Sequence, residues 1–361
     1  MKFSCEKNLL VSAISVASRT VAMKSAIPAL EGIYIRAGVK VMLSGYNLET
    51  GITVGVDAEI RETGEAIFPS RLFFDIVRKL PDDTVEVSVD ENFKVSIRGG
   101  ISSFSITAMS AEDYPELPDV ESEKGVVLPQ KQLKEMISGT IFAVSENQAR
   151  PIHTGCLFEV EEDSITVIAV DGYRLALRRW TPEGGIGRQM KFVAPAAALK
   201  EVEKILTDSD DDCTFYLGTK HILFTIGEAT LVCRILEGEF LDWRRVLPEN
   251  NPIKLAANVS AITDSIERVL VDVAGQLAVI LDGLQGFLVA VHANVADLGG
   301  GDQVQHTVDH AQAGAQNGHQ GQLTASQHLG AGQGHGGLDL DFLSRQVAGG
   351  LVAQQHGDLA Y

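Results

Sequence analysis

Short blocks of alternating hydrophobic and polar residues, separated by tight turns, run through the first two thirds of the chain. The clearest block, Ile165–Trp180, predicts a buried strand, a turn at Asp171–Gly172 and a second strand. Val41–Thr50 shows the same order of an apolar strand, Gly-Tyr, a polar residue and Leu. The Gly-Tyr pairs at Gly45 and Gly172 are 127 residues apart, which predicts a duplicated domain rather than a hairpin.

Segments with helical periodicity recur at a similar spacing. Phe68–Leu80 matches Val193–Leu206 at an offset of 126, and a proline precedes a short helix in both. The segments around Gly32 and Gly155 match at 123, so we expect one longer turn at Glu161–Ser164. Each copy also opens with an amphipathic helix, and a third such helix is predicted from about residue 258. The apolar positions expected to face a core are Leu72, Ile76 and Leu80, then Leu199, Val202 and Leu206, and in the opening helices Leu10, Ala13, Ile14 and Ala17, Leu133, Met136, Ile137 and Ile141, and Val259, Ile262, Ile266 and Val269.

The composition changes abruptly near Leu270. The last 92 residues contain no Lys, Glu, Pro, Cys, Met or Trp, yet they hold seven of the nine histidines. Leu270–Leu298 is apolar enough for a strand or helix, whereas Gly299–Gly337 has the composition of a disordered segment. His306–His310 has a spacing that suits a metal on a helix, but no carboxylate or cysteine set surrounds it, so no metal site is predicted. Our hypothesis is that the coding frame is lost near Val269, or that foreign sequence is joined there.

Overall composition limits the possible functions. A length of 361 residues and 45% hydrophobic content allow two or three domains with real cores. Without an apolar leader or a membrane-length span, the chain is expected in the cytoplasm with no membrane partner. The four cysteines are scattered singly, which argues against a disulfide framework or a zinc site. A net charge of −18 argues against a protein that coats DNA, although one basic face remains possible.

No catalytic constellation is found in the sequence. A phosphate-binding G-x-x-x-x-G-K-[ST] loop, a nucleophile elbow and an H-E-x-x-H motif are all missing. Gly184–Gly187 is a weak candidate for a phosphate-binding loop, and Asp208–Asp212 is interpreted as a solvated turn rather than a cation site. Asp171 and His221 could serve a hydrolase, but nothing in the sequence links them. We therefore expect no enzyme activity, no catalytic residues and no cofactor.

Several longer motifs, in a fixed order, resemble the bacterial sliding clamp, the beta subunit of the replicative DNA polymerase. They are M-K-F at the start, F-P-S-R-L-F-F-D-I-V-R-K-L, S-F-S-I, D-Y-P-E-L, R-P-I-H-T-G-C-L-F-E, V-D-G-Y-R-L-A and F-L-D-W-R-R-V-L-P, and the resemblance extends from Met1 to about Val269. It implies an α+β fold of repeated clamp domains, each with two helices packed on antiparallel sheets. It also implies a head-to-tail homodimer that acts in DNA replication as a non-catalytic processivity factor. The expected divisions are clamp domains at 1–125 and 126–250, the start of a third at 251–269, and an aberrant tail at 270–361.

The resemblance implies that helices facing the hole of a ring bind duplex DNA without sequence preference. Sliding requires diffuse attraction to phosphates, because contacts with base edges would fix the register. Basic pairs at helical spacing, Arg71 with Arg78, Lys131 with Lys134 and Lys200 with Lys204, fit this requirement, although alone they would be read as solvated helix faces. The positions matching the family's DNA contacts are Lys24, Arg71, Arg78, Asn147, Gln148 and Arg150. The sequence departs from the family at Pro195–Ala198, where a basic residue is common.

A second implied site is a groove for short peptide motifs. The implied partners are the polymerase catalytic subunit, the clamp loader, repair polymerases and other proteins with clamp-binding motifs. An apolar slot with arginines at its rim suits a peptide with leucine and phenylalanine anchors. The matching positions are His153, Val170, Gly172, Tyr173, Arg174, Leu175, Leu241, Arg245 and Val246. His153 stands where the family usually has an apolar residue, and Leu175 and Val246 could instead be core.

The third implied surface is the edge through which a ring closes. Phe104 and Ile106 match the edge strand that the first domain offers to its partner. The complementary surface belongs to the third domain, so a chain without that domain is expected to be an open monomer. The alternative function is therefore a ring-incompetent clamp that acts only as a peptide-binding adaptor or has no function.

Overall fold

The described residues form two compact units. The computed structural model describes residues 1–120, 125–247 and 258–275. The first unit spans Met1–Asp242, and the second begins at Trp243. The predictions for Gly299–Gly337, for His306–His310 and for Leu270–Leu298 beyond Gly275 fall outside the described residues.

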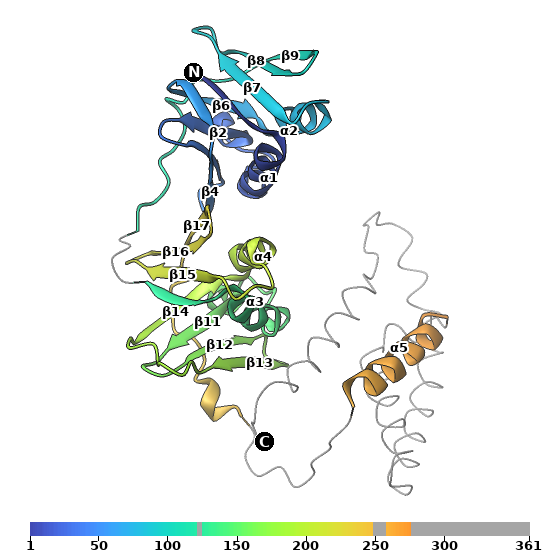
Figure 1. The fold of residues 1–361 in the computed structure, drawn as a ribbon. Helices are drawn as coiled ribbons and strands as arrows, with labels where there is room; N and C mark the ends of the chain where they lie inside the picture. Colours follow the sequence, from blue (N-terminus) through green and yellow to red (C-terminus); the bar gives the residue numbers. More distant parts are fainter. Residues whose placement is uncertain (121–124, 248–257, 276–361) are drawn as a thin grey trace, which may run out of the picture. The chain divides into compact units, whose positions relative to one another are not determined.

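The first copy of the repeat begins the first unit (Figure 1). Its strands are β1 (Lys2–Glu6), β2 (Gly32–Ala37), β3 (Val41–Tyr46), β4 (Thr50–Val56), β5 (Glu59–Glu62), β6 (Gly64–Pro69), β7 (Thr84–Val89), β8 (Lys94–Gly99) and β9 (Ser102–Thr107). Its helices are α1 (Lys7–Ala17) and α2 (Ser70–Lys79), with 3-10 turns η1 (Ser18–Thr20) and η2 (Pro28–Glu31).

The second copy follows the same order of elements, except that β5 has no counterpart in its described residues. Its strands are β10 (Val126–Pro129), β11 (Gly155–Val160), β12 (Ile165–Val170), β13 (Leu175–Trp180), β14 (Met190–Pro195), β15 (Asp212–Leu217), β16 (His221–Ile226) and β17 (Ala229–Arg234). Its helices are α3 (Gln130–Ser138) and α4 (Ala196–Ile205), with 3-10 turns η3 (Ile141–Ala143) and η4 (Pro151–Thr154). The predicted duplication is therefore present in the fold.

The strands of the two copies align at a different offset from the two Gly-Tyr pairs. β2 and β11 begin 123 positions apart, whereas α2 and α4 begin 126 positions apart. The turn before β12 is one residue longer than the turn before β3, and the turn after β12 is again one residue longer than its counterpart. Gly45 consequently lies inside β3, while Gly172 lies in the turn after β12. The turn at Glu161–Ser164 is longer than its counterpart, as expected, but by one residue only, because the other extra residues are spread over later turns.

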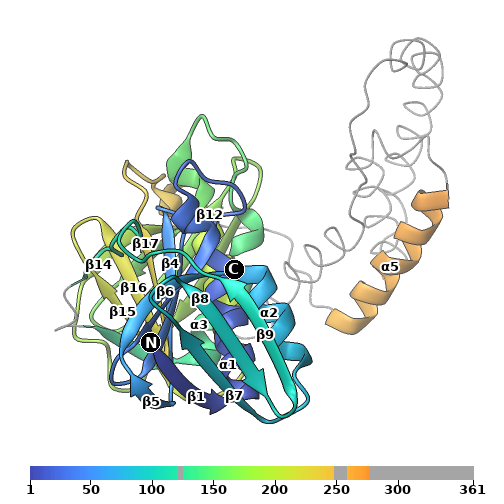
Figure 2. The ribbon, with the colours of Figure 1, turned by 90° about the horizontal axis from the view of Figure 1, so that it is seen from above.

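The strands form three antiparallel sheets with one sheet shared between the copies. The orders are β5-β1-β7-β8-β9, β13-β12-β11-β14, and β10-β15-β16-β17-β4-β3-β2-β6. Seen from above, β1, β7, β8 and β9 run side by side as one layer (Figure 2). In the eight-stranded sheet, β17 of the second copy pairs with β4 of the first, with Leu231 opposite Ile52. A continuous hydrogen-bonded ladder therefore joins the two copies.

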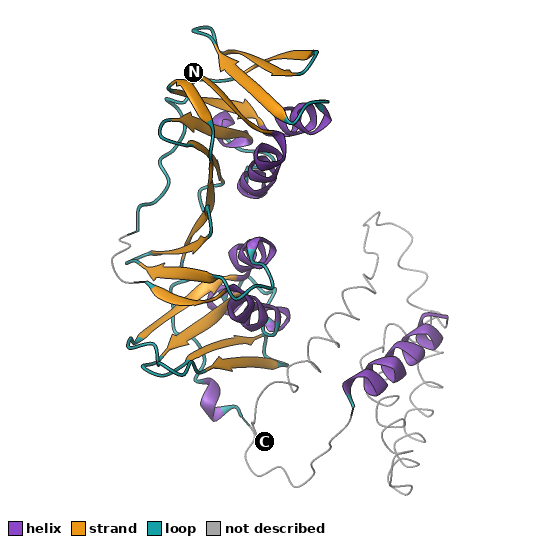
Figure 3. Cartoon of the chain, in the orientation of Figure 1, coloured by secondary structure: helices purple, strands orange, loops and turns teal. Residues whose placement is uncertain are grey.

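The helices cover one side of these sheets, as Figures 1 and 3 show for α1 to α4. All four predicted positions of α1 are buried, because spacings of three and four residues put them on one helical face. In α3 the first three predicted positions are buried, but the helix ends at Ser138. Ile141 therefore lies in η3 and is half-buried, contrary to the predicted helical stripe.

The buried face of α2 differs from the prediction. Phe73 and Val77 face the core, whereas Leu72 is exposed and Ile76 is only half-buried. The adjacent stripe, Phe73, Val77 and Leu80, has equally good helical spacing and carries the larger ring. The Phe73 ring packs edge-on against Phe68 with centroids 4.8 Å apart. This aromatic contact fixes which stripe faces inward.

The second unit contains one described α-helix. α5 (Val259–Gly275) confirms the third amphipathic helix, and Ile266 on its predicted stripe is buried. The helix continues past Val269 to Gly275. The 3-10 turn η5 (Trp243–Arg245) precedes it in the same unit.

Candidate nucleic-acid and peptide interfaces

Exposed basic residues lie on the helices that cover the sheets. Arg71 and Arg78 of α2 are both exposed and lie two helical turns apart on one face. Arg78 pairs with Asp75, with a nitrogen-to-oxygen distance of 3.4 Å, and its guanidinium lies over the Phe74 ring. Arg71 has no ion-pair partner among the described residues, so its charge is available to an external anion.

The same division applies to the basic residues of the second copy. Lys134 pairs with Asp208 at 2.9 Å, and Lys204 pairs with Glu201 at 2.7 Å. Lys131 and Lys200 are exposed and have no ion-pair partner in the described part of the chain. Each helical pair predicted from spacing therefore consists of one cation engaged by an acid and one without such a partner.

Two loops supply the remaining predicted contacts. Lys24 is exposed in the segment between η1 and η2. Asn147, Gln148 and Arg150 are exposed in the loop between η3 and η4. The Asn147 side chain shapes that loop because its Oδ1 accepts a hydrogen bond from the Ala149 N–H at 2.9 Å. This places Gln148 and Arg150 on one outward turn.

The turn between β12 and β13 presents the aromatic residue of the predicted groove. Oδ1 of Asp171 accepts hydrogen bonds from the N–H groups of Tyr173 and Arg174, at 3.0 and 3.1 Å. Nε of Arg174 donates to Oδ2 of Asp171 at 2.7 Å. Partial burial opposes ionisation of Asp171, but these hydrogen bonds and the Arg174 charge outweigh it and lower the pKa of the carboxyl. Gly172 takes a φ of 97°, which favours glycine, and Tyr173 is fully exposed.

His153 provides an apolar contact despite its polar ring. It packs edge-on against Phe240 with ring centroids 5.0 Å apart. Its buried Nδ1 has no hydrogen-bond partner among the described residues. Burial, and then the nearby Arg150 charge, lower the pKa of the imidazole. A neutral ring at this position keeps an aromatic surface against Phe240.

The other predicted groove residues differ in exposure. Val170 is buried at the end of β12, Leu175 is half-buried at the start of β13, and Leu241 is exposed. Arg245 and Val246 are exposed in the second unit. Within the first unit, Tyr173 and Leu241 thus provide exposed apolar side chains. Val170 is buried directly before the turn that carries Tyr173.

The predicted assembly strand lies at a sheet edge. β9 is the last strand of the five-stranded sheet and pairs with β8. Phe104 is 43% exposed, whereas Ile106 on the same strand is 8% exposed and belongs to the core. Of the two predicted residues, Phe104 is the one with a large apolar surface open to a partner.

Sequence reasoning missed the junction between the two copies. In addition to the β17–β4 ladder, Arg19 pairs with Glu201 of α4 at 3.4 Å. Lys40 pairs with both Asp57 and Glu228, at 3.1 and 3.0 Å. Opposite charges near positions 19 and 201 carry no local sequence signal, because only the folded sheet brings them together.

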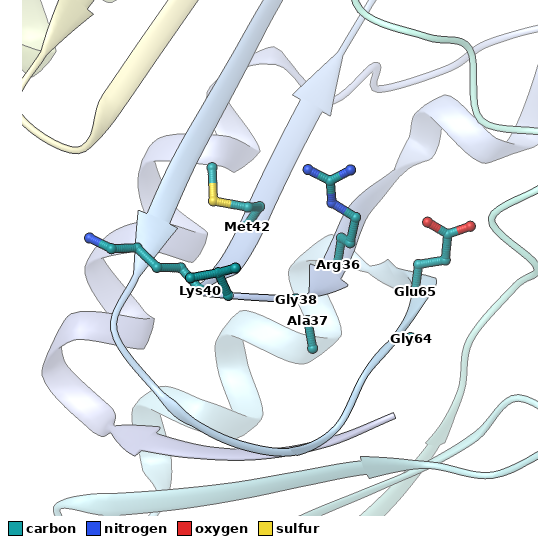
Figure 4. A pocket seen from close by; sticks show the side chains of 8 residues that line it. Arg36, Ala37, Gly38, Lys40, Met42, Gly64 and Glu65 are labelled. Carbon is teal, nitrogen blue, oxygen red and sulfur yellow. The ribbon is translucent and has the colours of Figure 1, made fainter.

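A shallow pocket lies at the turn between β2 and β3 (Figure 4). Arg36, Lys40, Met42 and Glu65 line it, and Glu65 accepts a hydrogen bond from the Tyr34 hydroxyl. The Lys40 ammonium is already engaged by two carboxylates. The Lys40 charge at this pocket is therefore largely neutralised by carboxylates outside it.

In the described ranges, no group of three or more His, Cys, Asp or Glu side chains is arranged to hold a metal ion. The four cysteines are free and buried. No helix in that part of the chain is long and apolar enough to cross a membrane.

Duplicated domains with helices on one side, joined through a shared sheet, define a clamp-type protein. The family model described as the DNA polymerase III beta subunit, N-terminal domain, matches residues 1–118, and the model of its central domain matches residues 127–242. The beta sliding clamp of Staphylococcus epidermidis is 32% identical over 277 residues, which cover 74% of this chain and 73% of the relative.

Solved structures of DNA polymerase III beta subunits are also similar to this chain. A putative DNA polymerase III beta subunit from Eubacterium rectale has 32% identity and a TM-score of 0.70, covering 74% of both chains. A Pseudomonas aeruginosa sliding clamp bound to griselimycin has 26% identity and a TM-score of 0.70, covering 74% of this chain and 73% of that one. The chain belongs to the DNA polymerase III beta subunit family, the beta sliding clamps. The resemblance and the fold class expected from the sequence are thereby confirmed, as is the assignment to a non-catalytic subunit.

Proposed function

We propose that this chain acts as a sliding clamp, a processivity factor that surrounds duplex DNA without reading its sequence. Family membership carries the proposal, and the helical face supports it, because three of its cations have no ion-pair partner within the described residues. Arg71, Lys131 and Lys200 offer separated positive charges that attract phosphates diffusely and leave register free. The adaptor-only alternative has no comparable support.

Retention on closed DNA tests the proposal. The full chain, mixed with a clamp loader and nicked circular DNA, should stay on the circle through a high-salt wash and leave after the circle is cut. Enclosure resists salt, whereas phosphate contacts alone do not. Equal loss from circular and linear DNA would exclude enclosure.

The DNA contacts are proposed at Lys24, Arg71, Arg78, Asn147, Gln148 and Arg150. Lys24, Arg71 and Arg150 should contribute most, because none of them has an ion-pair partner among the described residues. Arg78 should contribute less while Asp75 holds it. Lys24, Asn147, Gln148 and Arg150 are exposed in two loops, from which they would reach the phosphates.

The partners proposed for the groove are the polymerase catalytic subunit, the clamp loader and repair polymerases. In the first unit, the apolar positions offered to their peptide motifs are Tyr173, Leu175 and Leu241, with His153 against Phe240. The Asp171–Arg174 ion pair holds the guanidinium at the rim, where it would meet polar flanks of a peptide. A replication role and four reduced, buried cysteines support the cytoplasm as the compartment.

Peptide titration tests the groove. A fluorescent peptide with leucine and phenylalanine anchors should bind the wild type and lose roughly tenfold in affinity to Tyr173→Ala. Val127→Ala, which shortens an exposed side chain on β10, is the matched control and should bind normally. Equal affinity for all three proteins would remove Tyr173 from the groove.

A further inference from the structure

The pocket at the turn between β2 and β3 contains a cation that is open to solvent. Arg36 and Met42 line it side by side, since they lie opposite each other in the β2–β3 register. Figure 4 shows the Arg36 guanidinium between Met42 and Glu65. Arg36 is exposed and has no ion-pair partner among the described residues. An anionic group can therefore reach its guanidinium from solvent.

The nearest carboxylate, that of Glu65, is held by a different partner. Glu65 lies opposite Arg36 in the β2–β6 register, but its carboxylate accepts a hydrogen bond from the Tyr34 hydroxyl at 2.5 Å. The Tyr34 ring stacks on Tyr114 with centroids 5.0 Å apart, and the Tyr114 hydroxyl donates to the Ser44 carbonyl at 3.3 Å. Burial, and then the bond to Glu65, raise the pKa of Tyr34 to about 12, so its hydroxyl stays a donor at neutral pH. The two tyrosines thus keep Glu65 on Tyr34 rather than on Arg36.

Most of the remaining pocket wall is apolar. Val39 is 99% exposed in the turn, and Met42 is half-buried beneath it. The unbranched thioether of methionine adapts to side chains of different shape. The pocket volume of about 870 Å³ is large enough for a ligand, but the pocket is shallow and would leave much of a small molecule in water. A few residues of a longer chain fit such a surface better.

The charges around the pocket limit the kind of anion that it can take. Lys40 is engaged by Asp57 and Glu228 at 3.1 and 3.0 Å. Together with Glu65, these make three carboxylates against the two cations Lys40 and Arg36. A polyanion such as nucleic acid would be repelled by this surplus, whereas a single carboxylate can pair with Arg36. A guanidinium holds one carboxylate through two parallel hydrogen bonds.

The pocket lies on the side of the sheet away from the helices. Ile35 and Ala37 alternate with Arg36 along β2 and are buried in the core, so Arg36 points to the opposite face. The buried residues of α1 belong to the same core as Ile35. A ligand in the pocket would therefore not compete with anything bound to the helices.

We propose that this pocket binds a peptide segment of a partner protein in which an acidic residue follows a large apolar one. The carboxylate accepts two hydrogen bonds from the Arg36 guanidinium, and the apolar side chain packs on Met42. The site is separate from the groove around Tyr173, which belongs to the second copy of the repeat, and it does not depend on DNA binding.

Nuclear magnetic resonance of methionine methyl groups tests the site in the full-length protein. The chain has six methionines, so the Met42 signal can be assigned with Met42→Leu. The probe is a five-residue peptide, capped at both ends, with leucine and then glutamate at its centre. At millimolar concentration it should shift the Met42 signal saturably and leave that of Met136, buried in α3, in place.

A second peptide tests the need for the charge. Glutamine in place of glutamate should weaken binding roughly tenfold, because hydrogen bonds to a charged group are the stronger ones. A Met42 signal that does not move, or equal binding of the two peptides, would overturn the proposal. So would a shift of the Met42 signal caused by short duplex DNA, since nucleic acid would then occupy this face.

Variants of exposed arginines locate the carboxylate contact. Arg36→Gln should weaken binding of the glutamate peptide roughly tenfold. Arg98→Gln is the matched control, because Arg98 is also an exposed strand arginine without an ion-pair partner in the described ranges, and it should bind normally. Tyr173→Ala should bind normally too. Unchanged binding by Arg36→Gln, or a loss with Tyr173→Ala, would place the peptide elsewhere and overturn the proposal.

Tyr34 tests why Arg36 is available. Tyr34→Phe removes the hydroxyl that holds Glu65, so Glu65 should turn to Arg36 and compete with the peptide. The affinity should fall by about two- to fivefold, which is the range of an exposed ion pair. Tyr34→Phe combined with Glu65→Gln should regain the wild-type affinity. A double variant as weak as Tyr34→Phe would contradict this role of Glu65.

Discussion

Arg71 and Arg78 lie on the same face of α2 but have different electrostatic surroundings. Asp75 holds Arg78 at 3.4 Å, and Arg71 has no ion-pair partner in the described ranges. An arginine that is already paired gives up part of that interaction when it turns to a phosphate, whereas an unpaired one loses only hydration. Spacing along the helix predicts that both are basic contacts, but it does not show this difference.

This difference predicts unequal effects on DNA binding. Arg71→Glu should reduce the slope of log affinity against log salt by roughly one, as expected for a lost phosphate contact. Arg78→Glu removes a cation too, but one partly neutralised by Asp75, so its slope should change less. Salt titrations on short duplex DNA measure both. Equal slopes for the two variants would show that Asp75 does not distinguish the two arginines.

His153 should make stability depend on pH. Its pKa lies below 6.5 in the folded chain because of burial and the Arg150 charge. Between the folded and the unfolded pKa of His153, the unfolded chain therefore binds more protons than the folded chain. The contribution of His153 to the free energy of unfolding is fully present above pH 6.5 and is lost as the pH falls through the folded pKa. His221 is shifted in the same direction by burial and by Arg234 and Lys220, and it contributes a separate part.

Urea unfolding from pH 5 to 8 can separate the two histidines. His153→Leu should flatten the acid side of the stability profile, because it removes one titrating group and a buried ring nitrogen that has no hydrogen-bond partner in the described part of the chain. His221→Gln serves as the control for the other group. If His153→Leu keeps the wild-type profile, the pH dependence does not come from His153.

At the scale of single elements, the sequence predicts types better than faces. Alternation and helical spacing predict α1, α2, α4 and the β12–β13 hairpin, because each pattern is local. The inward face of α2 is mispredicted because two adjacent stripes fit the same period, and only the packing of Phe73 on Phe68 decides between them. The exposed Tyr173 depends on the Asp171 side chain, which a motif match alone does not reveal.

The two stripes of α2 can be compared directly. Phe73→Ala should lower the free energy of unfolding by roughly 3 to 5 kcal/mol, because it leaves a cavity between helix and sheet. Leu72→Ala should change it by less than about 1 kcal/mol, because Leu72 is 49% exposed. Urea unfolding of the two full-length variants measures the difference. A larger cost at Leu72 would restore the stripe predicted from the sequence.

At the scale of the whole molecule, the pairing of β17 with β4 could not be predicted from the sequence. The strands are about 180 residues apart, and neither carries a signal that names the other. Internal repetition predicts that the copies resemble each other, but not that they share a sheet. Since Leu231 and Ile52 are buried at this junction, the first unit should unfold as one cooperative body.

Leu231→Asp should separate the two copies energetically. A carboxylate buried between the strands costs several kcal/mol, so the ladder at the junction should open before either core. Calorimetry of the variant should show two transitions, against one transition of the first unit in the wild type. Leu241→Asp, at an exposed position outside the junction, is the control and should keep one transition. A single transition in Leu231→Asp would mean that the shared sheet does not couple the copies.

The shared sheet also affects how this protein is made on the ribosome. β4 is complete at Val56, but the strand that covers it ends only at Arg234. At the usual rate of translation the ribosome needs roughly ten to forty seconds to add that length of chain. Throughout this interval the nascent first domain exposes an apolar strand edge, which makes it a substrate for chaperones and vulnerable to misassembly with neighbouring nascent chains.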